Sequence, residues 1–380
     1  MKDFIPNIAI VIPCYNRVDT LEVLLESLNK ALYRQKVDLV FSIDYSGNSE
    51  IFSVAKKFNW KYGKKIIKQH EENIGLRKNI LFCGDMTTSY DAVIVLEDDL
   101  IVSQYFFDYA IEACMFYWDD ENVAEISLYS YKVSESLNVF YPMTNGYDTY
   151  FMQWTSSWGQ LWTRPQWEAF IGWYSKHDGD LSEALIPVHV KEWKKSWKKY
   201  HIAYLVDTNK YCVYPAISFS TTRPTIGTHS DIVKFYNPLF VQLFETKQRD
   251  YIFQRSYDSL KYDCFFQIKD LEIKYEGKII TVDFDLFCDK KRCNFNHSYY
   301  ITSKKNSKGS VLKSWGRYLL PFEKNVIEDI EGEGLYLFKI EDYETMKLTP
   351  TEKEDRKMFL SSSEHLMLLL NKLLKKVFHL

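Results

Sequence analysis

The chain has 380 residues, which is enough for one large core or for a large domain joined to a smaller one. Its content of 46% hydrophobic and 26% charged residues is typical of a globular protein. The net charge of −3 includes no basic excess of the kind that binds a polyanion, so we expect no nucleic-acid partner.

Cysteine usage and the start of the chain predict a cytoplasmic protein. The seven cysteines are odd in number and form no Cys-x-x-Cys pair, which favours reduced thiols over disulfides or a zinc site. The first residues lack the basic start and the small-residue cleavage site of a signal peptide. No apolar run approaches the ~20 residues that span a bilayer.

Strands and helices alternate along the first part of the chain. A continuous apolar run at residues 8–12 predicts a central parallel strand, and a helix with a stripe of leucines follows between about residues 20 and 32. Further strands, each followed by a helix, are expected at residues 37–43, 66–67 and 92–96. This alternation predicts an α/β fold with a mostly parallel, Rossmann-like sheet and helices on both faces.

Polar side chains follow three of these strands at the point where each strand ends. Arg17 lies in the loop after the first strand, Asp44 ends the second, and the triplet Glu97-Asp98-Asp99 follows the last. Ligands of such sheets bind beyond the carboxyl ends of the strands. We therefore expect these residues to meet in one crevice.

The character of the chain changes twice in its second half. After about residue 250, short alternating segments predict a small β-rich accessory region, so we divide the chain into residues 1–235, 236–360 and 361–380. The last segment is a basic amphipathic helix, with leucines on one face and lysines on the other. Such a helix can lie on the inner face of an anionic membrane or pack against protein, and both options stay open.

The acidic triplet is a candidate site for Mn²⁺ or Mg²⁺, because hard divalent cations prefer carboxylate oxygens and leave positions open for phosphate. If strand geometry persists through the triplet, Glu97 and Asp99 share a face and Asp98 turns toward a ribose. Asp99 is then the expected direct ligand. His229, in a Gly-Thr-His-Ser turn, is a further candidate for the metal or a diphosphate.

Besides Asp98, which could face a ribose, three residues are candidates for holding a nucleotide. Asp44 could accept hydrogen bonds from a base or a ribose, as carboxylates do in dinucleotide sites. Arg17 could donate to a base carbonyl or a phosphate. Arg77, near the start of a helix, could meet a phosphate.

A general base is expected between residues 148 and 207. Glu192 is our choice, because the neighbouring Trp193 could raise its pKa by desolvation. An exposed charge on a lysine-rich helix explains Glu192 equally well. The other candidates are Asp148, Asp178, Asp180 and Asp207.

The motifs in their order along the chain resemble those of GT-A fold glycosyltransferases. They are Val-Ile-Pro-Cys-Tyr-Asn-Arg, Ser-Ile-Asp, Val-Leu-Glu-Asp-Asp-Leu, Ser-Ser-Trp-Gly and Gly-Thr-His-Ser, over roughly residues 8–230. The pattern is similar to that of N-acetylglucosaminyltransferase I and of bacterial family 2-like enzymes that assemble surface polysaccharides.

This resemblance implies roles for individual residues. Asp99 would bind Mn²⁺, with Glu97 and Asp98 completing the metal motif. The residues that would hold a uracil-type base are Arg17 and Asp44. The residues that would shape the sugar and acceptor pocket are Trp154, Ser157 and Trp158. The family places its base in a Trp-flanked pair of aspartates, whereas the corresponding segment, residues 191–197, contains Glu192 as its only acid.

The sequence therefore predicts a metal-dependent inverting glycosyltransferase, a hexosyl- or N-acetylhexosaminyltransferase. Its donor would be a UDP-sugar and its acceptor a glycan or a lipid-linked glycan. A nucleotidyltransferase is an alternative, although the loop after the first strand has no glycine for a phosphate loop. A non-catalytic glycan-binding or scaffold protein of the same fold is a second alternative.

Overall fold

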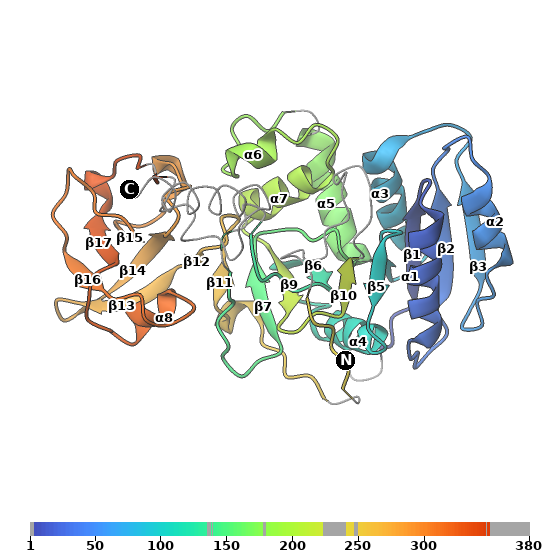
Figure 1. Cartoon of the computed structure of the whole chain (residues 1–380), viewed down its shortest axis with the longest axis horizontal. Helices are drawn as coiled ribbons and strands as arrows, with labels where there is room; N and C mark the ends of the chain where they lie inside the picture. The colour runs from blue at the N-terminus through green and yellow to red at the C-terminus, as the bar shows by residue number, and fades with distance from the viewer. Residues whose placement is uncertain are drawn as a thin grey trace, which may run out of the picture.

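The computed structural model describes residues 4–134, 138, 140–177, 180–222, 241–246, 250–346 and 348–349. Its largest element is a ten-stranded sheet in the order β12-β11-β7-β9-β6-β8-β4-β1-β2-β3. A separate five-stranded sheet lies beyond the β12 end of this sheet, at the opposite end of the molecule from β3 (Figure 1). The predicted α/β class is confirmed. Within the described residues, no helix is both long and apolar enough to cross a membrane.

The first half of the chain builds one side of the large sheet from parallel strands. These strands are β1 (Ile8–Cys14), β2 (Asp38–Ile43), β3 (Lys65–Gln69) and β4 (Ala92–Val95). The helices between them are α1 (Val18–Lys30), α2 (Glu50–Lys57) and α3 (Gly75–Asp85), with a 3₁₀ turn η1 (Met86–Thr88). All four strands expected from the apolar runs are present.

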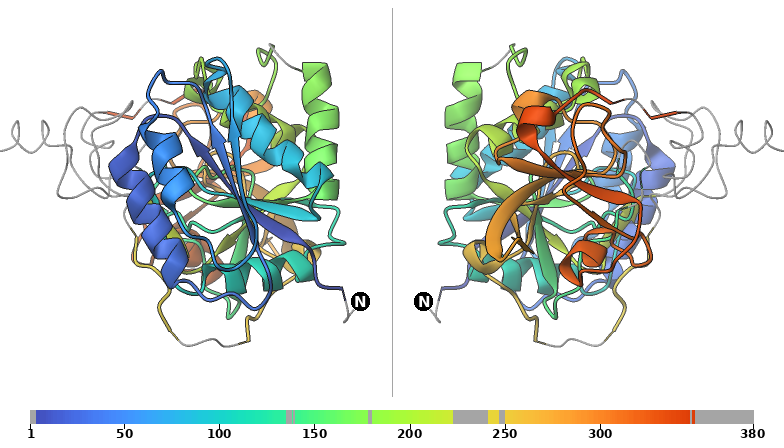
Figure 2. Two further views of the ribbon diagram at one scale, coloured as in Figure 1. Left: turned by 90° about the vertical axis from the view of Figure 1, so that its right-hand side faces the viewer. Right: turned by 90° about the vertical axis from the view of Figure 1, so that its left-hand side faces the viewer.

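Helices cover both faces of this sheet, as the alternating elements predict (Figure 2). In β1, the side chains of Ile8 and Ile10 enter one hydrophobic cluster with α1, α2 and α4 (Phe106–Phe116). The side chains of Ala9 and Val11 enter the other cluster, with α3 and α5 (Arg164–His177). Successive residues of a strand point to opposite faces, so a strand buried on both sides must be apolar throughout.

The second half of the large sheet is mixed, because β8 runs antiparallel to both β4 and β6. Its strands are β6 (Val123–Ser127), β7 (Thr149–Met152), β8 (Gln160–Thr163), β9 (Tyr211–Pro215), β11 (Lys261–Tyr262) and β12 (Ile268–Lys269). The two further helices are α6 (Val188–Lys191) and α7 (Lys198–Asp207). A small separate sheet pairs β5 (Leu100–Val102) with β10 (Ser220–Thr222).

The β-rich accessory region forms a sheet in the order β13-β14-β15-β17-β16. Its elements are β13 (Leu271–Tyr275), β14 (Lys278–Asp285), β15 (Tyr299–Thr302), β16 (Lys313–Trp315), β17 (Leu335–Lys339) and α8 (Glu323–Ile327). Three 3₁₀ turns accompany this half of the chain, η2 (Ser256–Asp258), η3 (Arg292–Asn294) and η4 (Ile340–Asp342). Because β11 and β12 extend the large sheet, the separate sheet begins only at β13.

The domain boundaries near residues 235 and 360 stay predictions. The amphipathic segment at residues 361–380 lies outside the described part of the chain.

Close packing between α3 and α5 depends on a glycine. A Cβ atom added at Gly84 would lie 2.2 Å from Cζ2 of Trp167, whose ring is buried and donates from Nε1 to Asp85 at 2.8 Å. We expect Gly84→Ala to lower the free energy of unfolding by about 1–3 kcal/mol, since the ring cannot retreat.

The matched control is Gly172→Ala, on α5, where an added Cβ meets nothing within 4 Å. That change should be neutral or raise stability by up to about 1 kcal/mol, because alanine favours a helix. Urea unfolding of both variants measures the difference. Equal stabilities would contradict the close packing.

Candidate active site

The candidate site lies where β1, β2 and β4 end. Arg17, in the loop after β1, reaches across to the turn after β4. Its Nη1 atom is 2.5 Å from Oδ2 of Asp99, and its Nη2 atom forms an ion pair with Oδ1 of Asp98. The backbone N–H of Tyr15 donates to the other oxygen of Asp98 at 3.4 Å. The structure thus brings Arg17 and the acidic triplet together, as the strand order suggests.

The expected side-chain alternation through the triplet is wrong. β4 ends at Val95, and the triplet forms a turn in which the N–H of Leu100 donates to the carbonyl of Glu97 at 3.2 Å. Asp98 and Asp99 consequently both face Arg17. Asp98 is buried with 2% of its surface exposed, so its side chain is held by protein groups in this structure.

The charges of the triplet are only partly compensated. Burial, together with the neighbouring Asp99, raises the pKa of Glu97 to about 8, although part of the Glu97 surface stays accessible. Burial likewise raises the pKa of Asp98 to about 6, against the lowering effect of Arg17. The Oδ1 atom of Asp99 is buried and has no hydrogen-bond partner among the described residues.

These features fit a divalent cation. An ionised carboxylate oxygen that is buried without a partner is costly, and a bound cation would remove that cost. Mg²⁺ is typically held by one or two carboxylates together with substrate phosphates, so Asp99 with Glu97 supplies enough protein ligands. The arrangement can therefore hold a metal ion beside a diphosphate.

Asp44 connects β2 to the start of α3. It is buried, and its carboxylate accepts the backbone N–H groups of Tyr45 at 2.9 Å, Ile74 at 2.8 Å and Gly75 at 2.9 Å. A carboxylate at a helix N-terminus is stabilised by the helix dipole and by these donors. Asp44 therefore fixes α3 against the strand end, and its role in nucleotide binding stays a prediction.

Arg77 contacts protein groups in this structure. Its Nη2 atom donates to the carbonyl of Lys194 at 2.9 Å, and its Nη1 atom donates to the hydroxyl of Tyr200 at 3.3 Å. The guanidinium also lies 4.7 Å from the centroid of the Tyr200 ring. Arg77 thus fastens α3 to the segment around α6 and α7, and phosphate binding stays a prediction.

Of the two interpretations of Glu192, the structure supports an exposed side chain. Glu192 directly follows α6 and is exposed, and the neighbouring Trp193 ring lies 6.1 Å from that of Trp154 between centroids. Its role as a base stays a prediction.

The other acidic candidates are held by local contacts. Asp148 accepts the N–H of Ile252 at 2.8 Å, Asp180 accepts the N–H of Ser182 at 2.9 Å, and Asp207 accepts the indole N–H of Trp173 at 2.7 Å. Two further candidates, Asp178 and His229, lie outside the described residues.

Lys198 is a residue of this segment whose charge acts on the site. It lowers the pKa values of both Glu97 and Glu125, against the larger effect of burial. The ammonium nitrogen is 5.7 Å from the ring centroid of Trp154 and 5.4 Å from that of Trp193. Because Lys198 is not an acid, it is not among the candidate bases in the sequence. The only sequence signal for it is its position close to Trp193.

The predicted pocket residues differ in exposure. Trp154 is buried and its indole N–H has no partner among the described residues. Ser157 and Trp158 are half-buried, and the Trp158 ring packs edge-on against Tyr129 at 4.7 Å. The loop thus presents Ser157 and Trp158 to the surface while Trp154 anchors it from below.

Glu125 supports this loop from within the sheet. It is fully buried on β6 and accepts the N–H of Ser156 at 3.2 Å and the indole N–H of Trp162 at 3.1 Å. Burial raises the pKa of Glu125 to about 8 and lowers that of His201 to about 3, so both are uncharged near neutral pH. An acid inside the apolar run of β6 is a signal that the sequence analysis missed.

Glu125, His201 and Cys212 also have their ligand atoms within 4.8 Å of one another, the one such group of three in the described chain. The Nδ1 atom of His201 is 2.6 Å from the hydroxyl of Thr155, and all three side chains are enclosed. We interpret the group as a buried hydrogen-bond network beneath the loop.

Comparison with known proteins gives one family. Residues 9–156 match the family model Glycosyl transferase family 2. No curated protein sequence matches the chain.

Solved structures match over part of their length. S. aureus TarS 1–349 in complex with UDP-GlcNAc is 14% identical, with a TM-score of 0.39 over 59% of this chain and 60% of that one. A mannosyltransferase from Pyrobaculum calidifontis in complex with GDP-Man and Mn²⁺ is 12% identical, with a TM-score of 0.34 over 57% and 58%. GalNAc-T7 with UDP, GalNAc and Mn²⁺ is 12% identical, with a TM-score of 0.40 over 56% and 43%. The chain spans at most 60% of each of these structures.

The raised pKa of Glu125 predicts a pH-dependent stability. Between its ordinary pKa of 4.5 and about 8, the folded protein keeps a proton on Glu125 that the unfolded chain releases. This contribution is full below pH 4.5 and is lost as the pH rises through about 8. Glu125→Gln does not titrate, so the stability of the wild type relative to this variant should fall as the pH rises.

Thermal unfolding of both proteins between about pH 5 and pH 8 measures this difference, and other titrating groups cancel between them. A difference that is constant or that grows with pH would show that Glu125 is ionised in the fold.

Proposed function

We propose that this chain, whose residues 9–156 are a glycosyltransferase family 2 domain within a GT-A fold, transfers a sugar from a nucleotide-diphosphate donor with the help of a divalent cation. The observation that carries the proposal is the buried, unpartnered Oδ1 atom of Asp99, in an acidic turn fixed by Arg17 at the end of β4. A carboxylate oxygen that is already oriented and has no partner can bind a metal ion without rearrangement.

Different residues would bind the diphosphate and the nucleoside of the donor. A bound Mn²⁺ or Mg²⁺ ion would neutralise the diphosphate that leaves. Asp99 would hold the ion with Glu97 beside it, while Arg17 keeps the Asp99 carboxylate oriented. Asp98 and Asp44 would act at the nucleoside, Asp44 by setting the position of α3. The side chains of Arg17, Asp44, Asp98 and Asp99 are held in position by hydrogen bonds and ion pairs within the protein before a ligand binds.

The finer features of the reaction follow the resemblance of the motifs. We take the donor to be a UDP-sugar and the transfer to be inverting, with a hexose or an N-acetylhexosamine moved to a glycan or a lipid-linked acceptor in surface polysaccharide synthesis. The loop with Ser157 and Trp158 would border the sugar and the acceptor. Contact of residues 361–380 with the inner membrane surface is part of the same proposal.

Glu192 stays our candidate for the base that takes the acceptor proton. It is the only carboxylate between Ala184 and Val206. Because the Glu192 side chain is exposed, binding of the acceptor would have to enclose it. Lys198, whose charge acts on Glu97, would then act on charge at the donor rather than on the acceptor proton.

We expect Asp99→Asn to reduce Mn²⁺-dependent UDP release from UDP-sugars by about 100-fold or more, because the amide keeps the size of the carboxylate but loses its charge. A matched control is Glu26→Gln, which removes an exposed acid on α1 that pairs with Lys30. Thermal unfolding checks that both variants stay folded.

Undiminished UDP release by Asp99→Asn would reject the metal site. If wild-type protein binds UDP and Mn²⁺ in calorimetry but turns over no sugar donor, the non-catalytic alternative is favoured. Release of pyrophosphate from UTP and a sugar phosphate would favour the nucleotidyltransferase.

If Glu192 is the base, Glu192→Gln should lower kcat by about 100-fold and leave the affinity for UDP and Mn²⁺ unchanged, since the base acts on the acceptor alone. Glu183→Gln, which changes the other exposed acid near α6, is the control. Steady-state kinetics with calorimetry give both quantities. A kcat within about twofold of wild type would remove Glu192 from the mechanism.

A further inference from the structure

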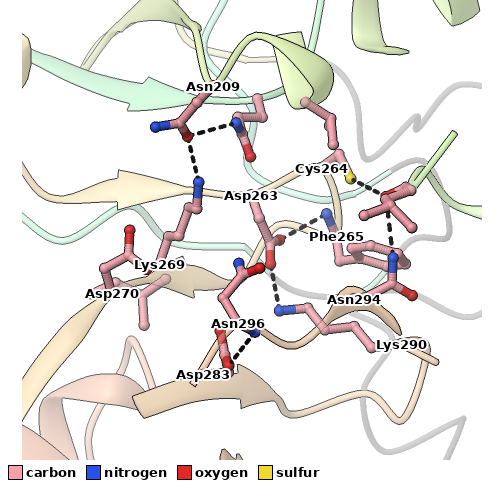
Figure 3. Close-up of a pocket in the computed structure, with 14 residues that line it drawn as sticks. Asn209, Asp263, Cys264, Phe265, Lys269, Asp270, Asp283, Lys290, Asn294 and Asn296 are labelled. Carbon is pink, nitrogen blue, oxygen red and sulfur yellow. Dashed lines mark hydrogen bonds and ion pairs between the residues drawn. The ribbon is translucent and has the colours of Figure 1, made fainter. Parts of the chain in front are cut away.

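A polar cavity lies between the large sheet and the accessory sheet, outside the candidate active site (Figure 3). Its volume is about 380 Å³, within the range of ligand-binding pockets. Its walls come from five parts of the chain: Gln153 after β7, Leu185 before α6, the end of α7 from Val206 to Asn209, the connection from Asp263 to Asp270, and the region of Asp283 to Asn296.

We propose that this cavity is a second carbohydrate-binding site, which takes one or two neutral sugar units of the acceptor glycan. The identification of the occupant as acceptor rests on the proposed function, whereas binding of a neutral saccharide does not.

The lining suits a neutral ligand with many hydroxyl groups. It includes three aspartates, two lysines, three asparagines and one glutamine. One pair of opposite charges lies within it, since Nζ of Lys290 is 2.5 Å from Oδ2 of Asp263. The other lysine, Lys269, donates from Nζ to Oδ1 of Asn209 at 2.6 Å. With three carboxylates and two ammonium groups, the lining is close to neutral, and it offers donors and acceptors to hydroxyl groups without strongly favouring a polyanion or a cation.

The polar groups are held in place before any ligand arrives. Oδ2 of Asp283 accepts the N–H groups of Asn296 at 2.8 Å and His297 at 2.7 Å. Oδ1 of Asp263 accepts the N–H groups of Phe265 at 2.8 Å and Gln267 at 3.1 Å. Groups that are already ordered lose little entropy on binding, which favours recognition of a small saccharide.

The cavity also has an apolar surface and an open donor. Phe265 is half-buried in its wall and offers a ring on which the C–H face of a sugar can pack. The Asn296 side chain is exposed at the cavity and makes no hydrogen bond within the described part of the chain, so its amide can serve a ligand. An aromatic face beside amides and carboxylates is the combination that a sugar ring requires.

The cavity shares a wall with the predicted acceptor loop. Gln153 lines the cavity and directly precedes Trp154. Phe266, next to the lining residue Phe265, packs against the ring of Trp154 at 5.0 Å between centroids. A glycan held in the cavity would therefore lie on the acceptor side of the site, which is why we assign its occupant to the acceptor.

The test uses the full chain without donor or metal. Chitobiose, lactose, maltose and mannobiose are titrated up to about 10 mM and followed by calorimetry and ligand-observed NMR. Asn296→Trp fills the opening and Asn296→Ala removes the amide, while Asn29→Ala changes an exposed asparagine on α1 as the control.

We expect at least one neutral disaccharide to bind the wild type, with affinity about tenfold weaker in Asn296→Trp, weaker by a smaller factor in Asn296→Ala and unchanged in Asn29→Ala. UDP and Mn²⁺ should bind all four proteins equally. The proposal is overturned if none of the disaccharides binds, if Asn296→Trp leaves binding intact, or if inorganic phosphate competes for the cavity.

Failure of this inference is distinct from failure of the proposed function. Loss of saccharide binding leaves the result with Asp99→Asn untouched. If a disaccharide binds in the cavity but the wild type turns over no sugar donor, the binding site stands and the transferase does not.

Discussion

The structure depends first on one guanidinium shared between two carboxylates. Arg17 pairs with Asp98 and Asp99 and so joins the loop after β1 to the turn after β4, across more than eighty residues of sequence. Three successive acids at the end of a buried strand repel one another and lose hydration, and this cation offsets part of that cost. Because Arg17 binds Oδ2 of Asp99, Oδ1 is left for a ligand. The same ion pair therefore stabilises the fold and orients the proposed metal ligand.

The covering of both faces of the sheet sets where polar groups can act. Strands β1 and β4 are apolar along their length, and β2 is apolar at its buried positions apart from Ser42, which bonds to Asn79 of α3. The candidate site residues therefore come after these strands end. Glu125 breaks this rule inside β6. It remains compatible with burial because Ser156 and Trp162 donate to it and because its raised pKa keeps it protonated near neutral pH. The exception lies directly beneath the loop that the sequence assigns to the sugar and acceptor.

The sequence predicted what depends on local pattern. The apolar runs located the four parallel strands, and strand polarity brought Arg17 to the triplet. It could not predict the path of the triplet itself, because the chain turns there to form β5, whose partner β10 lies more than a hundred residues away. The exposure of Glu192 was likewise open in the sequence, because the burial of a residue beside a helix as short as α6 depends on tertiary packing. The cavity combines five distant segments and has no local signature.

The placement of β11 and β12 has a consequence for where the chain can be divided. Lys261 and Tyr262 pair with β7 at the border of the large sheet, and Phe266 of the same hairpin supports Trp154. A fragment that stops near residue 235 would leave unpaired the backbone N–H and C=O groups of β7 that face β11. An unpaired edge strand promotes aggregation. The hairpin of β11 and β12 thus belongs to the large sheet, although it lies in the part of the chain beyond residue 235.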